Sequence, residues 1–291
     1  MRVPARRIFS RGGVDVWSAD LADGGPARDL HGWLDPDELA RAARMPEGVV
    51  RDRFASARGI LRGILGAYLS ADPRQLRFAY GGRGKPELQP GPLPRVHFNV
   101  SHSGAGMVCA VSFRFPVGID LERIRVLPEL PALVQRHWTD PEKAALRRLD
   151  PSKATEAFYC WWTSKEAVSK CFGSGILLDW DGYSVRIDPE SDPGILDPEP
   201  PGAPALRCAL TAIDAGPGYA CVLASAEDRG GNGRNPGLRA RKKPEIAPET
   251  LGAAGSRWAN ICYDLSVGST HPSSLPHQGT PEFLRTMLRR Q

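Results

Sequence analysis

The sequence predicts an α+β fold built from two similar halves, each with one long helix and several short strands. Two stretches, residues 50–70 and 153–172, place apolar side chains at three- and four-residue spacing, which is typical of amphipathic helices. Each stretch is followed by short β-like runs between turns rich in glycine and proline. Helix followed by strands thus occurs twice, although we see no residue-level repeat. We expect two α+β halves, 13–117 and 118–226, packed pseudo-symmetrically side by side, and a low-order tail over 227–291.

The first half begins with a strand, because residues 14–21 alternate apolar and polar side chains. Asp35 and Glu38 then surround a proline at the first helical position, a pattern that indicates a capped helix. The long helix over 50–70 follows. The sequence predicts three further strands, at 76–80, 96–100 and 107–113.

The second half begins with a strand over residues 117–122. Thr139 and Glu142 repeat the capping pattern and predict another short helix. The long helix over 153–172 comes next. The remaining strands are predicted at 183–187, 206–211 and 219–224.

Composition and charge exclude several classes of protein. Hydrophobic residues make up 41% and charged residues 24%, which is close to the globular average. Most of the net charge of +5 lies after residue 226, so the basic isoelectric point does not indicate nucleic-acid binding. No apolar run is long enough to span a membrane. Six cysteines without a C-x-x-C pair fit reduced thiols in a cytoplasmic protein.

Two carboxylates on one strand form the first candidate site. Asp120 and Glu122 are two residues apart, so a strand directs both side chains to the same face. Neighbouring carboxylates repel each other unless a cation lies between them, and oxygen ligands favour Mg²⁺ shared with phosphate. The alternative is a solvated strand face with no bound ion.

The long second helix carries further charged candidates. Glu166 and Lys170 are four residues apart on its flank, and Lys165 falls near the centre of its apolar face. A lysine in that position must find an anion or extend its ammonium group to water. The alternative is that Lys165 extends its ammonium group to water, beside a surface ion pair of Glu166 with Lys170.

Candidate phosphate contacts lie in the first half. Lys85 sits in a glycine-rich turn where backbone N–H groups can approach an anion. This turn is not a Walker loop, because Pro86 replaces the required hydroxyl residue. Ser101, His102 and Ser103 end a strand and offer two hydroxyls and an imidazole, although turn chemistry and a satisfied histidine would also explain them.

Four sequence blocks, by their residues and their order along the chain, resemble the 4'-phosphopantetheinyl transferase superfamily, specifically its longer, two-half Sfp-type branch. The blocks are GKP at 84–86, FNVSHS at 98–103, VGIDLE at 117–122 and WTSKEAVSK at 162–170. The last two are highly specific as a pair. The resemblance covers about residues 14–225.

The resemblance implies an enzyme that moves the phosphopantetheine arm of coenzyme A onto a serine of an apo carrier protein. Asp120, Glu122 and Glu166 match the family's Mg²⁺-binding carboxylates, and Glu166 is also the implied base. Lys170 matches a catalytic basic residue beside the pyrophosphate.

The resemblance also implies a set of coenzyme A contacts. A neighbouring lysine of the family is Glu38 in this chain. The matching positions are Arg41, Arg53, Lys85, Ser101, His102, Lys165 and Lys170.

The implied partners are coenzyme A and an acyl or peptidyl carrier protein. The resemblance also implies a monomer that binds neither nucleic acid nor membranes. Two other functions stay open. One is a metal-dependent phosphodiesterase or nucleotide hydrolase using the same carboxylates, although the sequence lacks the His/Asp clusters that such sites favour. The other is an inactive homologue that binds only the nucleotide or the carrier.

Overall fold

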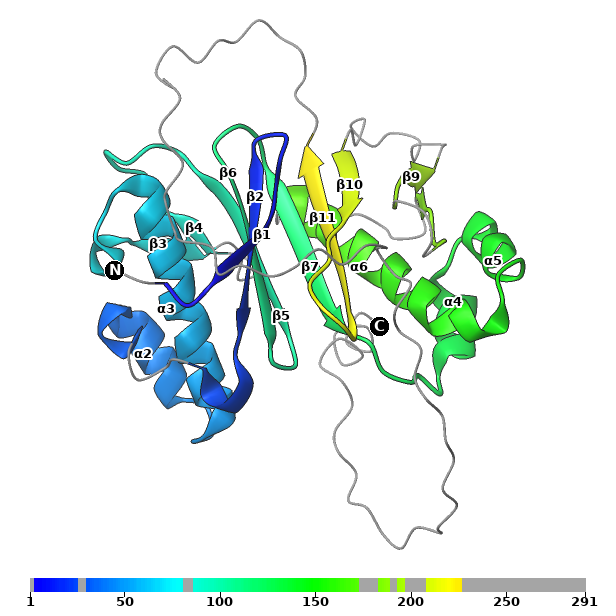
Figure 1. The fold of residues 1–291 in the computed structure, drawn as a ribbon, viewed down its shortest axis with the longest axis horizontal. Helices are drawn as coiled ribbons and strands as arrows, with labels where there is room; N and C mark the ends of the chain where they lie inside the picture. Colours follow the sequence, from blue (N-terminus) through cyan, green and yellow to red (C-terminus); the bar gives the residue numbers. More distant parts are fainter. Residues whose placement is uncertain are drawn as a thin grey trace, which may run out of the picture. The chain divides into compact units, whose positions relative to one another are not determined.

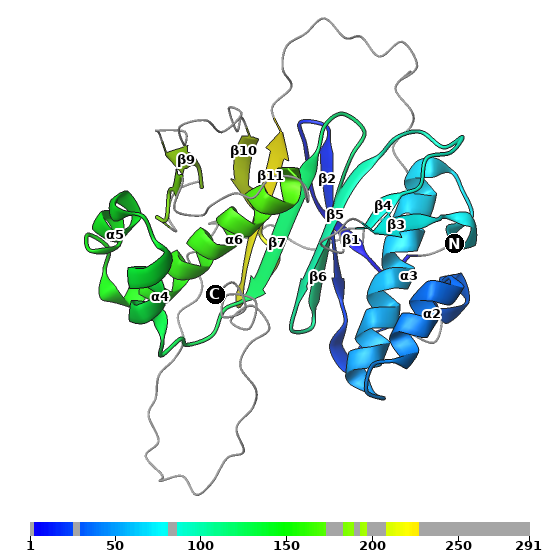
Figure 2. The ribbon, with the colours of Figure 1, turned by 180° about the vertical axis from the view of Figure 1, so that it is seen from behind.

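Two long helices and several antiparallel sheets make up the described part of the protein, which Figures 1 and 2 show from opposite sides. The computed structural model describes residues 3–25, 30–80, 86–172, 183–188, 193–196 and 208–226. All of them belong to one compact unit. The mixed α+β class predicted from the sequence is confirmed. The expected tail over 227–291 and the candidate Lys85 lie outside the described residues.

The first half of the chain forms a four-stranded antiparallel sheet in the order β1-β2-β6-β5. Its strands are β1 (Arg6–Arg11), β2 (Val14–Asp20), β5 (His97–Ser103) and β6 (Gly106–Ser112). The helices of this half are α2 (Pro36–Ala43) and α3 (Val49–Leu69). A small two-stranded sheet pairs β3 (Phe78–Tyr80) with β4 (Pro86–Leu88).

The second half forms a three-stranded antiparallel sheet in the order β10-β11-β7. Its strands are β7 (Val117–Arg123), β10 (Cys208–Ala212) and β11 (Tyr219–Ala226). The helices are α4 (Leu130–His137), α5 (Asp140–Leu146) and α6 (Ala154–Phe172). A short pair joins β8 (Ser184–Val185) to β9 (Ile195–Leu196).

Four short 3₁₀ helices complete the described secondary structure: Ala22–Gly24, His31–Trp33, Pro73–Gln75 and Pro151–Lys153. None of the described helices is long and apolar enough to cross a membrane.

Helix α3 packs its apolar side against one face of the four-stranded sheet. Ile60 and Leu65 are fully buried there, in the same cluster as Trp17 of β2. The indole N–H of Trp17 donates a hydrogen bond to the Tyr68 hydroxyl over 3.0 Å, and that hydroxyl donates to Asp15 Oδ2 over 2.5 Å. The polar groups that this packing buries are therefore satisfied by one another.

The opposite face of the four-stranded sheet packs on the three-stranded sheet. Val16 and Ala110 from the first sheet share a buried cluster with Ile119, Cys221 and Leu223 from the second. The apolar residues that alternate along β7 thus enter a core common to both halves, while their neighbours Asp120 and Glu122 face the other way.

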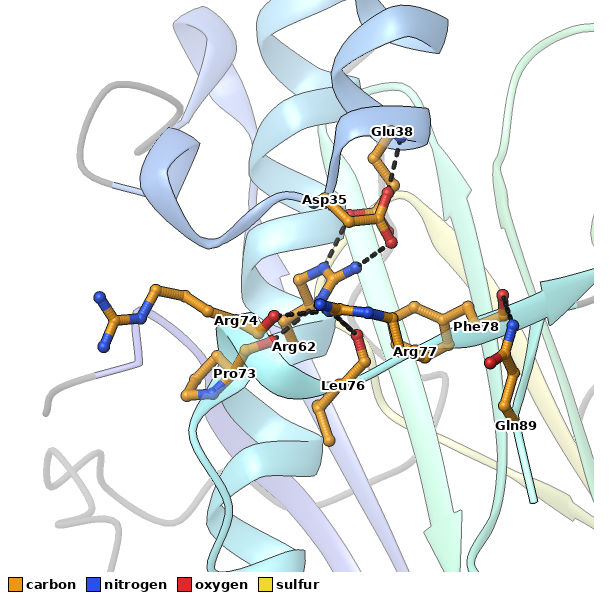
Figure 3. Close-up of polar contacts among 9 residues, drawn as sticks. All are labelled: Asp35, Glu38, Arg62, Pro73, Arg74, Leu76, Arg77, Phe78 and Gln89. Atoms are coloured by element: carbon orange, nitrogen blue, oxygen red, sulfur yellow. Dashed lines mark hydrogen bonds and ion pairs between the residues drawn. The ribbon is translucent and has the colours of Figure 1, made fainter. Parts of the chain in front are cut away.

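The strand order of the first half recurs in the second, since β2-β6-β5 corresponds to β7-β11-β10. A residue-level feature recurs with it. In the first half, the Asp35–Glu38 capping box begins α2, and the buried Arg62 of α3 pairs with both acids, at 2.5 Å to Asp35 Oδ2 and 2.7 Å to Glu38 Oε2. Arg62 also donates to the carbonyl oxygens of Pro73 and Leu76, as Figure 3 shows.

The second half repeats this arrangement with a lysine. A capping box of Thr139 and Glu142 begins α5, and Glu142 Oε1 lies 3.2 Å from Lys165 Nζ of α6. Lys165 Nζ donates to the Tyr183 carbonyl oxygen, and Glu142 Oε1 accepts the N–H of Val185 over 2.8 Å. A residue-level repeat that was not visible in the sequence is therefore present in the structure: each half uses a capping glutamate and a cation of its long helix to fasten the segment that follows that helix.

Candidate active site

Helix α6 lies directly on β7, and this close approach builds the site. It depends on Gly118, because a Cβ atom there would overlap the backbone of Ala167 and Cys171. The Cys171 thiol also lies 3.4 Å from the Pro116 carbonyl oxygen, just before the strand. A glycine in the strand therefore lets the flank of the helix reach the carboxylates of β7.

The central contact joins Lys170 of α6 to Asp120 of β7. Lys170 Nζ lies 2.5 Å from Asp120 Oδ1. The Ser101 hydroxyl of β5 completes a triangle, since it donates to the same oxygen over 3.0 Å and accepts from Lys170 Nζ over 3.2 Å. Burial opposes the charge on Lys170, but the carboxylates of Asp120, Glu166 and Glu122 outweigh it and raise the pKa of Lys170. The site therefore holds a permanent cation beside three acidic side chains.

Glu122 has a different environment from Asp120. Burial, together with the negative charge of Asp120, raises the pKa of Glu122 to about 7, against the Ser103 hydrogen bond and the nearby charges of Lys170 and Arg125. The Ser103 hydroxyl donates to Glu122 Oε2 over 2.8 Å. Two acids on one strand face thus repel each other strongly enough that a further cation would be stabilised beside them.

The residues present fit a divalent cation in one specific respect. Asp120 Oδ2 is buried and accepts no hydrogen bond from any described residue, whereas Oδ1 has two donors. A buried carboxylate oxygen without a partner is costly, and a hard cation would satisfy it. As they stand, no three His, Cys, Asp or Glu side chains within the described ranges are grouped to hold a metal ion. The predicted triad of Asp120, Glu122 and Glu166 therefore stays a prediction.

Lys165 does not lie in this site. It was expected beside the pyrophosphate, but its side chain is fully buried in the ion pair with Glu142, and its ammonium group lies 4.0 Å from the Tyr183 ring centre. Residues 165 and 170 of a helix point in different directions, so only Lys170 reaches β7. Lys165 thus fastens α5 and β8 to α6, and its expected contact with coenzyme A stays a prediction.

The other predicted coenzyme A contacts lie on elements of the first half. Arg53 of α3 donates from Nε to the Leu21 carbonyl oxygen over 3.1 Å, just after β2. Arg41 lies in the last turn of α2, with its guanidinium 5.4 Å from the Phe54 ring centre. His102 is exposed on β5. The polar contacts that the structure gives Arg41 and Arg53 do not connect them to Asp120 or Lys170.

Sequence reasoning named Ser103 only as a candidate phosphate contact, and it missed Arg125 as a neighbour of the carboxylates. Ser103 stands in the FNVSHS block and bonds Glu122, and its spacing of two from Ser101 on a strand could have indicated that it shares the same face. Arg125 is close enough for its charge to lower the pKa of Glu122. Strand β7 ends at Arg123, so the strand periodicity does not extend to Arg125. The sequence therefore gives no sign that Arg125 lies nearer the carboxylates than other arginines around it.

Comparison with known proteins finds a family match over part of the chain. The family model "4'-phosphopantetheinyl transferase superfamily" matches residues 116–221, which include the acidic strand β7 and helix α6. The 4'-phosphopantetheinyl transferase HetI of Nostoc sp. is 42% identical over 154 residues, which are 51% of this chain and 63% of that protein. A putative 4'-phosphopantetheinyl transferase of Synechocystis sp. is 36% identical over 143 residues, or 49% and 58% of the two chains.

The 4'-phosphopantetheinyl transferase Sfp of Bacillus subtilis is 29% identical over 167 residues, which are 57% of this chain and 70% of that protein. The chain thus spans less than two thirds of the length of the Nostoc and Synechocystis relatives. The family match coincides with the β7–α6 junction at which Lys170 and Asp120 meet. Residues 116–221 therefore match the 4'-phosphopantetheinyl transferase superfamily, and the chain is similar to transferases of this kind from Nostoc and Bacillus.

Proposed function

We propose that the protein transfers the 4'-phosphopantetheine arm of coenzyme A to a serine of an apo acyl or peptidyl carrier protein, giving holo carrier protein and 3',5'-ADP. The observation that carries this proposal is the contact of Lys170 Nζ with Asp120 Oδ1, inside the region that matches the superfamily. A cation fixed between a helix and an acidic strand can stabilise the negative charge that develops on the leaving group in the transition state.

The proposed metal is Mg²⁺, held by Asp120, Glu122 and Glu166. The buried, unpartnered Oδ2 of Asp120 and the mutual repulsion of the β7 carboxylates support this assignment. When bound, Mg²⁺ would supply charge neutralisation for the pyrophosphate of coenzyme A. Its ligands would be carboxylate oxygens, which is the donor type that Mg²⁺ prefers.

The proposed reaction is a displacement at the phosphorus that carries pantetheine. The serine oxygen of the carrier forms a bond to this phosphorus, and the bond to the bridging oxygen of the pyrophosphate breaks, so that 3',5'-ADP leaves. Glu166 accepts the serine proton, a role that a carboxylate within hydrogen-bond reach can fill. Lys170 carries a charge that faces the departing oxygen and stabilises it. Such transfers depend mainly on positioning and electrostatics.

Coenzyme A would bind across both halves. Arg41, Arg53 and His102 are the proposed contacts from α2, α3 and β5, with Lys85 as a further contact from the sequence, and Ser101 beside Lys170 at the pyrophosphate end. The halves themselves are proposed as 13–117 and 118–226. Their repeated strand order supports that division, and β7 begins at the boundary. We propose that one copy of the chain is sufficient for activity, since the partners required are coenzyme A and the carrier.

Incubation of the full chain with coenzyme A, Mg²⁺ and an apo carrier protein tests the function, with the intact mass of the carrier as the readout. The expected result is one phosphopantetheine on the carrier serine and release of 3',5'-ADP, both prevented by EDTA and restored by excess Mg²⁺. Consumption of coenzyme A with an unmodified carrier would mean a hydrolase. Binding of coenzyme A without any conversion would mean a module that has lost the chemistry.

A further inference from the structure

A row of polar side chains on β5 faces β7, although the two strands belong to different sheets. Asn99, Ser101 and Ser103 are spaced by two, so they project from the same side of β5. Asn99 Oδ1 accepts the backbone N–H of Ile119 over 2.8 Å, and Ser101 Oγ accepts that of Leu121 over 3.2 Å. Side-chain oxygens thus take the place that a neighbouring strand's carbonyl groups would have in a continuous sheet.

Ser103 continues this row by accepting the N–H of Arg123 over 3.0 Å. Each of the three side chains bonds the residue 20 positions further along the chain, so β5 and β7 run in one direction and in constant register. This register fixes which carboxylate each hydroxyl can reach. It also ties the edge strand of the first half to the acidic strand of the second.

The two serines make a second bond each, to the acidic side chains between those N–H groups. Ser101 Oγ donates to Asp120 Oδ1 over 3.0 Å, and Ser103 Oγ donates to Glu122 Oε2 over 2.8 Å. A hydroxyl has one proton to donate and two lone pairs, so accepting a backbone N–H leaves its proton for the carboxylate. Each hydroxyl therefore links the backbone of β7 to a carboxylate of the same strand.

The two serines differ in what else they touch. Ser101 also lies 3.2 Å from Lys170 Nζ, so its removal would disturb the ammonium group and the carboxylate together. The side-chain bonds of Ser103 go to the N–H of Arg123 and to Glu122. Glu122 is therefore the charged side chain of the site to which Ser103 bonds directly.

We propose that Ser103 is a positioning residue that holds the Glu122 carboxylate in the orientation required for cation binding. The proposal rests on the proposed function, because it concerns a proposed ligand of the metal. A glutamate side chain has three rotatable bonds and would otherwise sample several rotamers beside Asp120. Hydrogen bonds to ligating carboxylates are worth about 10- to 100-fold in metal affinity in other sites, which sets the size of the expected effect.

Four variants of the full chain test this role. Ser103→Ala removes the hydroxyl. Ser103→Thr and Ser103→Val form a matched pair, since the two side chains have the same shape and both suit a strand, and only Thr keeps the hydroxyl. Ser112→Ala is the control, because Ser112 is buried at the far end of β6 and its hydroxyl also accepts backbone N–H groups, those of Arg114 and Phe115.

Binding of Mn²⁺ alone, followed by the EPR signal of the free ion, is the first measurement, and thermal unfolding is the second. Ser103→Ala and Ser103→Val should weaken Mn²⁺ binding by about 10-fold or more, whereas Ser103→Thr should stay within about 3-fold of the unsubstituted protein. Ser112→Ala should bind Mn²⁺ normally even where it lowers the melting temperature. If Ser103→Ala fails to fold, the comparison of Thr with Val decides the matter.

Equal Mn²⁺ affinity of the Thr and Val variants would overturn the role of Ser103, as would an equal loss in Ser112→Ala. Failure of the proposed function can be distinguished from failure of the Ser103 role. An unsubstituted protein that neither binds Mn²⁺ nor modifies a carrier would overturn both proposals. An unsubstituted protein that transfers the arm, with Ser103 variants that bind Mn²⁺ normally, would overturn the positioning role alone.

Discussion

Lys170 Nζ lies 2.5 Å from Asp120 Oδ1, so a helix and a strand that are 50 residues apart in the chain meet at one charged contact. The helix can come this close because residue 118 of the strand is glycine. Ser101 bonds both members of the pair from a third element. The site is therefore assembled from long-range contacts. Substitutions at these positions should differ in how much they change stability and how much they change transfer.

Replacing Lys170 by methionine should abolish transfer and also destabilise the protein. The change leaves the buried Asp120 carboxylate without its cation, and because Lys170 itself is partly exposed we expect a cost of about 3 kcal/mol, the lower end of the range for buried pairs. Chemical denaturation measures the loss. Lys143→Met is the matched control, because Lys143 lies 4.0 Å from the exposed Asp140 and should change the free energy of unfolding by less than about 0.5 kcal/mol. Similar stability of the two variants would show that the Lys170–Asp120 contact contributes little.

Glu166→Gln should abolish transfer while largely preserving the fold. The substitution keeps the shape of the side chain and removes both its basicity and its charge. Glu156→Gln lies on the same helix, about 15 Å away along its axis, and should transfer at the normal rate. Single-turnover kinetics and thermal unfolding distinguish the two. Unfolding of the Glu166 variant, or transfer at the rate of the Glu156 variant, would remove Glu166 from its proposed role as the base.

Gly118→Ala should be among the most damaging single-methyl changes in the chain. The added Cβ would overlap backbone atoms of α6, which cannot rotate away, so we expect a loss of about 3 kcal/mol or more together with loss of transfer. Gly32→Ala is the control, since a Cβ there meets nothing within 4 Å. Urea denaturation compares the two variants. A stable and active Gly118→Ala protein would contradict the close packing of α6 on β7.

Lys165→Met should destabilise the protein without a specific effect on coenzyme A. Its partner Glu142 is equally buried, so the single change should cost about 3–5 kcal/mol. The double variant Lys165→Met/Glu142→Gln should recover part of this loss, because no unpaired charge remains buried. The KM for coenzyme A, measured on the folded fraction, should be unchanged. A raised KM with normal stability would return Lys165 to the coenzyme A site.

The sequence predicted the regular elements that have strong local signals. The two capping boxes and both long helices were recognisable, because their caps and apolar spacing are local properties. Strand β1 was missed because its residues are mostly polar and exposed, as suits an edge strand. Helix α4 was missed because its N-cap position, Glu129, makes no side-chain cap.

The site was predictable in its residue types and only partly in its geometry. The spacing of Asp120 and Glu122 placed both on one face of a strand. The positions of Lys165 and Lys170 on α6 did not reveal which one reaches β7, because that depends on how the helix is rotated over the sheet. Glu142, which binds Lys165, lies 23 residues before it, and no local pattern connects the two.

The most direct test of the account compares Asp120→Asn with the unsubstituted protein by the intact mass of a carrier protein after incubation with coenzyme A and Mg²⁺. The account predicts that the unsubstituted protein adds phosphopantetheine to the carrier and that the Asp120→Asn protein, although folded, adds none. Equal modification by both proteins would contradict it, as would a carrier that gains no mass with the unsubstituted protein.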